Sequence, residues 1–243
     1  MLIAITGASG FIGSHLVKAL SKKYQLRLLV RNSNIPNTTN KNLEIRVVDF
    51  ESARDIKHSL QGVDILYHLA GLLPNAKVPD SEYFQTNSLL VKRLAKVASI
   101  IPTIKQFVYC STAYVAWDSL LPATTYEKSK LRGEDYLKEI SSKTKLPFII
   151  IRPGFVYGGN GSGLLSLAKT IKSKHFFYFG LGNHFFEITH IDDLVHFFEL
   201  VTASSQASYQ TFTVSPRSPL TFRRLVELIA LNLKVKPPAF HLS

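Results

Sequence analysis

Cysteine, long apolar runs and concentrated charge are all scarce in this chain. Its 243 residues include a single cysteine, Cys110, which excludes an intramolecular disulfide and is typical of a reducing compartment. No apolar stretch reaches the ~18 residues that a membrane-spanning helix needs. The apolar N-terminus, residues 1–5, lacks the basic region of a signal peptide and is soon interrupted by glycine. We therefore expect a cytoplasmic protein that makes no membrane contact.

Acidic residues are also few. They number 17 against 29 basic residues, which gives a formal net charge of +12. The basic residues form no dense run, and pairs such as Lys22-Lys23 and Arg223-Arg224 are typical of solvated helix faces. We expect a basic surface that attracts phosphate-bearing cofactors, and no nucleic-acid partner. RNA binding by a non-catalytic, nucleotide-sensing protein is the alternative that the charge leaves open.

Two catalytic patterns are missing. The nucleophile-elbow pattern Gly-x-Ser-x-Gly does not occur, since Ser162 lies in Gly161-Ser162-Gly163, and this disfavours serine hydrolysis. The histidines do not cluster with cysteine or carboxylates at ligand spacing, so we expect no metal site.

What the chain does have is an alternation of apolar strands and amphipathic helices. Strands are predicted at 2–5, 25–30, 43–48, 63–69, 104–110 and 147–151, and helices at 11–20, 52–60, 81–98 and 124–140. This order predicts an α/β fold, a Rossmann-type doubly wound parallel sheet, over residues 1–152. Residues 153–243 contain more glycine clusters and shorter elements, with helices predicted at 164–173, 191–203 and 221–233. They predict a smaller C-terminal substrate-binding lobe.

A glycine loop follows the first predicted strand. Gly7 permits a tight turn, Gly10 permits close approach of a pyrophosphate, and Gly13 permits close packing of helix on strand. The helix that begins there presents unpaired N–H groups to phosphate. The spacing Gly-x-x-Gly-x-x-Gly at the start of a strand–helix unit therefore predicts dinucleotide binding. The predicted contacts are Gly7, Ser9, Gly10, Phe11, Ile12 and Gly13.

The ends of the second and third strands bear on which dinucleotide binds. A carboxylate is expected about 20 residues after the glycines if the ribose 2′-hydroxyl is bound. The chain has Arg31 there, which would pair with a 2′-phosphate. We therefore predict NADP as the cofactor, with NAD as the alternative. Asp49 and Phe50 follow the third strand, where they are predicted to contact the adenine; a turn role for Asp49 is the alternative.

Two further strands end in small or hydroxyl-bearing residues. Leu69, Ala70 and Gly71 end the fourth strand and would let a cofactor pass close to the backbone. Ser111 and Thr112 end the fifth, where a hydroxyl can hydrogen-bond a substrate oxygen. His68 is interpreted as a core histidine.

Tyr126 and Lys130 carry the predicted chemistry. They are four residues apart on a predicted helix, so they share one face. A tyrosine titrates near ~10, and a nearby ammonium favours the phenolate and lowers that pKa toward the working range. With the glycine loop, this pair predicts redox chemistry at a carbon that bears oxygen.

These segments resemble the extended short-chain dehydrogenase/reductases, in the group of NAD(P)-dependent epimerases and dehydratases. The matching segments occur in the family's order at 6–13, 49–50, 68–71, Asn87, 111–112, 126–130, 152–158, 190–194 and 219–222. The resemblance implies that Tyr126 is the catalytic acid/base, that Lys130 holds the nicotinamide ribose, and that Thr112 polarises the substrate oxygen. It also implies that Pro153 and Val156 contact the nicotinamide end of the cofactor.

The resemblance leaves the reaction open between two alternatives. Nucleotide-sugar members usually carry an arginine near the position of Phe186, so this chain favours an NADP-dependent oxidoreductase acting on a smaller or more apolar alcohol or carbonyl. A nucleotide-sugar epimerase or dehydratase is the alternative. Members usually continue past the residue that matches Ser243, so the smaller lobe is expected to be truncated relative to theirs. They often form homodimers through two helices, and here Leu89, Leu90, Leu94 and Val97 serve either that contact or the core.

Overall fold

The structure is a computed structural model that describes residues 1–32, 40–75, 77–116, 123–159, 161–216, 218, 220–239 and 241–242. It contains two compact units by its internal contacts. The first comprises Met1–Arg152 and Val195–Thr213, and the second comprises Pro153–Leu194 and Val214–Ser243.

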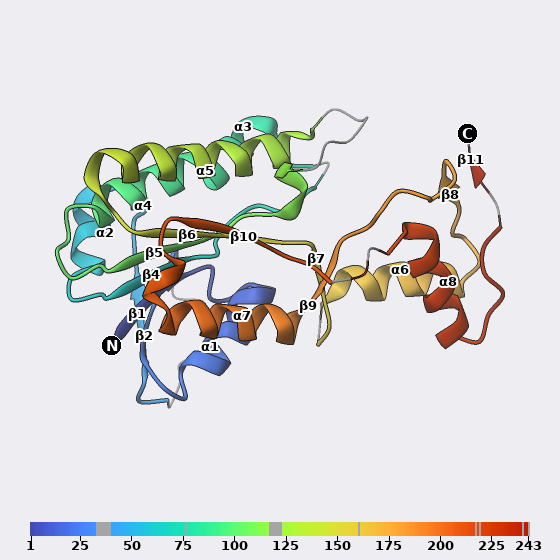
Figure 1. Ribbon diagram of the computed structural model, residues 1–243, viewed down its shortest axis with the longest axis horizontal. Helices are drawn as coiled ribbons and strands as arrows, with labels where there is room; N and C mark the ends of the chain where they lie inside the picture. Colours follow the sequence, from blue (N-terminus) through green and yellow to red (C-terminus); the bar gives the residue numbers. More distant parts are fainter. Residues whose placement is uncertain are drawn as a thin grey trace. The chain divides into compact units, whose positions relative to one another are not determined.

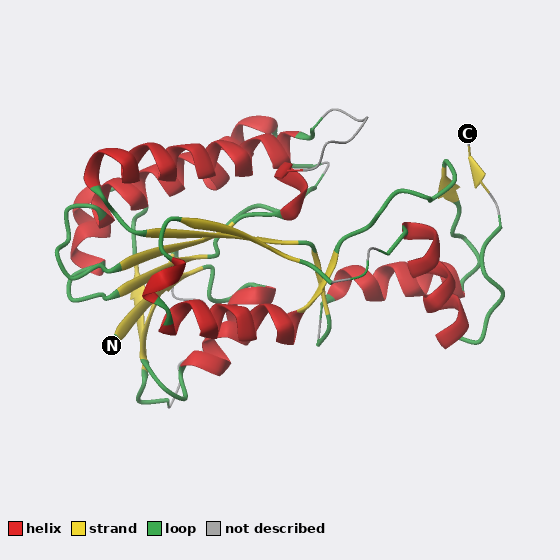
Figure 2. Cartoon of the chain, viewed as in Figure 1, coloured by secondary structure: helices red, strands yellow, loops and turns green. Residues whose placement is uncertain are grey.

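A seven-stranded sheet forms the centre of the first unit (Figures 1 and 2). Its order is β10 (Gln210–Val214), β6 (Phe148–Pro153), β5 (Gln106–Cys110), β4 (Ile65–His68), β1 (Leu2–Thr6), β2 (Gln25–Val30) and β3 (Leu43–Val47). The pairings from β6 to β3 are all parallel. Helices cover both faces of the sheet, so its strands are apolar along most of their length.

Figure 1 shows α1 (Phe11–Leu20) and α7 (Ile191–Ala203) on one face of this sheet. The other face carries α2 (Ala53–Ser59), α3 (Asp80–Phe84), η1 (Gln85–Leu89), α4 (Leu90–Ala98) and α5 (Thr125–Thr144). Leu90, Leu94 and Val97 are buried in the core beneath these helices. Of the alternatives left by the sequence, the structure gives these three side chains the core role.

The predicted Rossmann-type doubly wound sheet is confirmed, and the predicted elements agree closely with the observed ones. One helix differs in kind. The sequence predicts a continuous helix over 81–98, whereas the structure interrupts it with η1, a π-helix. A π-helix inserts a residue into the helical turn, and such insertions are frequent at functional sites.

The division of the chain differs from the predicted one in one segment. Residues 195–213 were expected in the smaller lobe, but they belong to the first unit. Tyr67 on β4 explains this, because its hydroxyl donates to the carbonyl of Phe198 at 3.0 Å and is also hydrogen-bonded to Thr202. β10 then lies beside β6 and extends the sheet.

In the residues that the structure describes, the second unit contains two small sheets and two helices. β7 (Phe155–Tyr157) pairs in parallel with β9 (Ile188–His190), and β8 (Tyr178–Phe179) pairs with β11 (His241–Leu242). α6 (Ser162–Lys172) and α8 (Phe222–Asn232) pack around Ile171, Tyr178 and Val226. Among the described residues, the first unit also contains two short 3₁₀ turns, η2 (Ala113–Ala116) and η3 (Ser205–Ala207).

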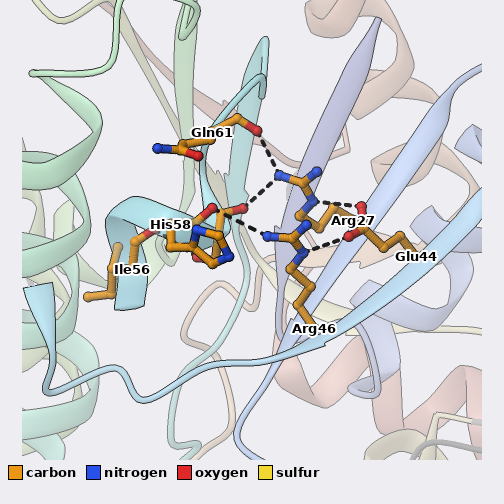
Figure 3. Close-up of polar contacts among 7 residues, drawn as sticks. Arg27, Glu44, Arg46, Ile56, His58 and Gln61 are labelled. Atoms are coloured by element: carbon orange, nitrogen blue, oxygen red, sulfur yellow. Dashed lines mark hydrogen bonds and ion pairs between the residues drawn. The ribbon is translucent and has the colours of Figure 1, made fainter. Parts of the chain in front are cut away.

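A buried arginine fixes the outer edge of the sheet to α2 (Figure 3). Arg27 on β2 donates to its cross-strand partner Glu44 at 2.8 Å and to the carbonyls of Ser59 and Gln61 at 2.9 and 2.8 Å. Those carbonyls lie at the end of α2, where no intrahelical donor remains. Although burial raises the pKa of Glu44, hydrogen bonds from Arg27 and Arg46 hold it below its usual value.

In the part of the chain that the structure describes, no helix has both the length and the apolar composition needed to cross a bilayer.

Candidate active site

The glycine loop after β1 has no room for side chains at two positions. Gly7 has φ +73°, and a Cβ on it would lie 2.5 Å from the backbone nitrogen of Ala70. A Cβ on Gly13 would lie 2.1 Å from the carbonyl oxygen of Gly7. The Gly10 amide donates to that same carbonyl at 3.0 Å and closes the turn. The packing of strand, turn and helix therefore requires both Gly7 and Gly13.

A cleft of about 420 Å³ lies over this loop. Its lining includes eight of the predicted cofactor residues, namely Gly7, Ser9, Gly10, Arg31, Phe50, Leu69, Ala70 and Gly71. Phe11, Ile12 and Gly13 are not in the lining. They form the first turn of α1, whose amides have no intrahelical acceptor, and the N-cap Gly10 offers no side-chain acceptor. The loop therefore has the features of a phosphate-binding helix terminus.

A second cavity of about 500 Å³ continues from the first and shares Arg31, Phe50, Thr86 and Leu90 with it. Arg31 is exposed, and Asn32 follows it, so no carboxylate lies at the end of β2. Asp49 lines this cavity while its Oδ1 accepts the Glu51 amide at 2.9 Å. Asp49 therefore holds a turn and borders the cavity at once. The two cavities therefore adjoin each other beside the glycine loop, and Arg31 lines both.

Tyr126 and Lys130 lie in the first turns of α5, as predicted. Thr124 begins this helix with a capping box: its hydroxyl accepts the Glu127 amide at 3.4 Å, and its own amide donates to the Glu127 carboxylate at 2.7 Å. Lys130 is buried, and its Nζ donates to the carbonyl of Cys110 at 2.6 Å and lies 4.6 Å from the centroid of the Tyr109 ring. The ammonium is thus fixed at the carboxyl end of β5.

Tyr126 is hydrogen-bonded to the side chain of Thr112, which is buried after β5. Burial raises the pKa of Tyr126 above its usual value, and the hydrogen bond from Thr112 opposes this rise only in part. The expected lowering of this pKa by Lys130 is therefore not what the structure shows. The physical reason is that desolvation outweighs the nearby groups that favour the phenolate.

Burial also lowers the pKa of Lys130, to about 8, although electrostatic interactions with Cys110 and Glu134 oppose the shift. His68 has its pKa lowered to about 3, first by burial and then by the charge of Lys130. Its Nδ1 is hydrogen-bonded to Thr6 Oγ1 at 2.7 Å, and its ring stacks on Tyr109 with centroids 5.6 Å apart. His68 is therefore a neutral core residue, as interpreted from the sequence.

Asn87 is a site residue whose local role the sequence did not reveal. It is fully buried on the π-helix η1, where its Oδ1 accepts the Leu72 amide at 2.8 Å and its Nδ2 donates to Ser129 Oγ at 3.1 Å. Its carbonyl accepts the hydroxyl of Tyr109 at 3.1 Å. Asn87 thus joins the loop after β4 to the helix that carries Tyr126 and Lys130. Its place in the family's motif order was the available signal.

Ser111 lies directly before Thr112 and is also buried. Its amide donates to the carbonyl of Ile151 at 2.7 Å, whereas its hydroxyl has no hydrogen-bond partner among the described residues. A buried hydroxyl without a partner costs free energy unless a ligand completes it. Ser111 lines neither of the two cavities described above, so its contact with a cofactor remains a prediction.

Pro153 and Val156 belong to the second unit, where Val156 on β7 pairs with Thr189. Their contact with a cofactor remains a prediction. Phe186 packs in the same unit against Phe155 and Phe222, with ring centroids 5.6 and 5.4 Å apart. Within the described residues, no three His, Cys, Asp or Glu side chains gather closely enough to hold a metal ion.

Several known proteins are similar to this chain in sequence. The chain is 26% identical to a UDP-glucose 4-epimerase of Vibrio cholerae, over 95% of this chain and 75% of that protein. It is 26% identical to the ketoreductase sphI of Aspergillus fumigatus, over 80% of this chain and 72% of that protein. An uncharacterised protein of Sinorhizobium fredii is 24% identical over 93% of this chain, which spans only 59% of that protein's length.

A solved structure shows the same fold: the UDP-glucuronic acid 4-epimerase of Bacillus cereus in complex with NAD. It has a TM-score of 0.85 and 21% identity, and the match covers all of this chain and 88% of that one. The model of the NAD dependent epimerase/dehydratase family matches residues 3–215. The chain therefore belongs to the NAD-dependent epimerase/dehydratase family, a family of enzymes.

Proposed function

We propose that this protein transfers a hydride between a nicotinamide cofactor and a substrate carbon that bears a hydroxyl or carbonyl oxygen. The observation that carries the proposal is the arrangement in the first unit. Tyr126 is hydrogen-bonded to Thr112, and the buried Lys130 is anchored at the end of the neighbouring strand. The phosphate-binding loop and its cleft belong to the same unit.

Each residue has a separate task in this proposal. Tyr126 moves a proton to or from the substrate oxygen, and Thr112 orients the same oxygen by hydrogen bonding. Lys130 holds the nicotinamide ribose and supplies positive charge that favours the phenolate once the site is filled. The bound cofactor supplies the hydride or accepts it. Asn87 and Tyr109 keep the helix of Tyr126 against the strand of Thr112.

For the cofactor, Arg31 supports a preference for NADP. It is exposed, it lines both cavities, and no carboxylate at the end of β2 would repel a 2′-phosphate. The solved relative described above binds NAD, so a nicotinamide dinucleotide is common to both alternatives and the 2′-phosphate distinguishes them.

The favoured reaction is a net reduction or oxidation with exchangeable NADP. The second candidate is the epimerisation or dehydration of a nucleotide sugar, in which the cofactor is oxidised and reduced again within one cycle. The name of the Vibrio cholerae relative favours this candidate, as the name of the fungal ketoreductase favours the first. Cofactor that stays bound through purification would favour the second candidate, and free exchange would favour the first.

The test compares Tyr126→Phe with Tyr136→Phe, which makes the same chemical change further along α5. Purified proteins are assayed for oxidation of NADH and NADPH with a panel of aldehydes and ketones, and for interconversion of UDP-sugars. Loss of the acid/base group should reduce turnover by roughly 10²–10⁴-fold while leaving cofactor affinity nearly unchanged. Tyr136→Phe should keep full turnover. Equal turnover of Tyr126→Phe and the wild type would overturn the assignment.

A further inference from the structure

We propose that a segment of the second unit, residues 172–181, binds the surface of an anionic lipid bilayer. The segment runs from the end of α6 through β8, and it combines exposed aromatic side chains with lysines. A peripheral contact of this kind needs no spanning helix, so it differs from the expectation of no membrane contact, which rested on the lack of one. The inference goes beyond the proposed function, because none of these residues belongs to the first unit.

Three large apolar side chains of this segment are exposed to solvent. The exposed fraction is 37% for Phe177, 78% for Phe179 and 64% for Leu181. The rings of Phe177 and Phe179 contact each other, with centroids 5.2 Å apart, so they form one patch. Exposed apolar patches bordered by polar residues are typical of protein or membrane contacts. Burial of these rings among acyl chains would remove apolar surface from water and favour binding.

The residue between the two rings holds them outward. Tyr178 is buried, and its ring stacks on that of His241 in β11, with centroids 4.9 Å apart. Side chains alternate along a strand, so the burial of Tyr178 directs Phe177 and Phe179 to the opposite face. The exposure of the two phenylalanines therefore follows from the pairing of β8 with β11 and from the packing of Tyr178.

Arg223 fixes the turn after β8. Its Nε donates to the carbonyl of Leu181 at 3.0 Å, and its amide donates to the carbonyl of Gly182 at 2.8 Å. The guanidinium carbon also lies 5.5 Å from the centroid of the Tyr178 ring. The segment is thus ordered before it meets a partner, so binding would not pay the cost of ordering it.

The charge of the segment indicates which partner binds. No acidic residue occurs between Glu139 and Glu187 in the sequence. Lys172 ends α6 and Lys174 follows it, and both are exposed. Lys174 lies three residues before Phe177, so it is within about 11 Å of it along the chain. An anionic bilayer would attract this basic segment, whereas the same segment of a second copy would be repelled.

The experiment measures co-sedimentation of the full chain with two kinds of vesicle. One kind is phosphatidylcholine alone, and the other contains about 30% phosphatidylglycerol, which supplies the negative charge. The wild type should bind the anionic vesicles at least about tenfold more tightly, and added salt should weaken this binding. Phe179→Ser should lower the affinity by about tenfold. Lys172→Gln/Lys174→Gln should lower it by about 25-fold, since each basic residue contributes about fivefold.

Two control variants make the same chemical changes elsewhere. Leu165→Ser removes an exposed apolar side chain near the start of α6, where Gly163 lies against Phe155 of β7. Figure 1 shows β8 and β11 at the end of the second unit remote from β7 and β9. Lys18→Gln/Lys22→Gln removes two exposed lysines at the end of α1 in the first unit. Both controls should bind within about threefold of the wild type.

A wild type that binds neither vesicle, or binds both equally, would overturn the inference. Segment variants that bind as the wild type does would overturn it too, as would controls that lose as much affinity as the segment variants. Sedimentation velocity without lipid tests the other occupant: a dimer that Phe179→Ser dissociates would show that a second copy covers the patch, against the inference. Thermal melting and NADPH affinity of every variant should match the wild type, which separates lost lipid binding from unfolding and from failure of the proposed function.

Discussion

Replacing Gly13 with alanine should damage both the fold and the cofactor site. The added Cβ would lie 2.1 Å from the Gly7 carbonyl oxygen, about 1.3 Å short of the 3.4 Å at which ordinary contact begins. It would also lie 2.9 Å from Ala8 Cα, so the helix cannot move away without displacing the loop. Both obstacles are backbone atoms, which cannot rotate aside as a side chain would.

The magnitude follows from two opposing effects. Alanine favours a helix over glycine by about 1 kcal/mol. Overpacking against fixed neighbours costs about 1–3 kcal/mol, and more where backbone must move. Because both obstacles are backbone atoms, the upper end of this cost applies, and we expect a net loss of at least about 2 kcal/mol in the free energy of unfolding. Because the displaced Gly7 carbonyl is the acceptor that closes the turn, the phosphate-facing amides should shift, and cofactor affinity should fall by about a hundredfold.

Two other glycines serve as controls. A Cβ on Gly10 would lie 3.3 Å from the Gly7 carbonyl, so Gly10→Ala should keep its stability but lose cofactor affinity if pyrophosphate lies there. Gly62 has φ +73° with open space around it, so Gly62→Ala should lose about 1 kcal/mol and keep its affinity. Urea unfolding and NADPH titration measure the two effects. Wild-type stability and affinity in Gly13→Ala would refute the argument.

Two further predictions concern buried charge. Arg152 donates to Glu134 at 2.8 and 2.6 Å, and Glu134 is fully buried. Lys138 also donates to Glu134, at 3.4 Å, so Arg152→Met leaves this carboxylate one weaker partner and should cost about 3 kcal/mol in urea unfolding, the lower end for breaking a buried pair. Adding Glu134→Gln should recover most of this loss; a loss below about 1 kcal/mol for the single variant would contradict the prediction. The pKa of Lys130 is lowered to about 8, so the lysine is charged below that pH in the free protein and neutral above it. Cofactor affinity should be flat below pH 8 and fall above it, with Lys130→Met showing no such bend; an affinity constant up to about pH 10 would contradict the role of the charge.

Local patterns in the sequence were enough to predict the sheet, the glycine loop and the helix of Tyr126 and Lys130. Each depends on residues close together in the chain: an apolar run, a glycine spacing, or a pair four residues apart. The allocation of α7 could not be predicted this way. The sequence pattern of an amphipathic helix is the same whichever unit the helix covers. The allocation depends on contacts between residues distant in sequence, such as the hydrogen bonds of Tyr67 with Phe198 and Thr202.

For a similar reason, the sequence did not predict the π-helix or the raised pKa of Tyr126. The helical pattern over 81–98 does not reveal the hydrogen bonds of Asn87. Its carbonyl accepts from Tyr109, and its side chain accepts from Leu72 and donates to Ser129. The pKa of Tyr126 depends on how deeply the neighbouring strands bury it, and spacing along a helix does not report burial. The sequence thus predicts which groups react, whereas their burial and hydrogen bonds come from the structure.

We propose that the first unit holds a nicotinamide dinucleotide and has all the residues that the hydride transfer needs. The most direct test is a fluorescence titration of the purified protein with NADPH and NADH. We expect saturable binding, with NADPH tighter by about an order of magnitude because Arg31 would pair with the 2′-phosphate. Tighter NADH would make Arg31 a surface residue and favour the nucleotide-sugar reaction. Binding of neither would contradict the claim.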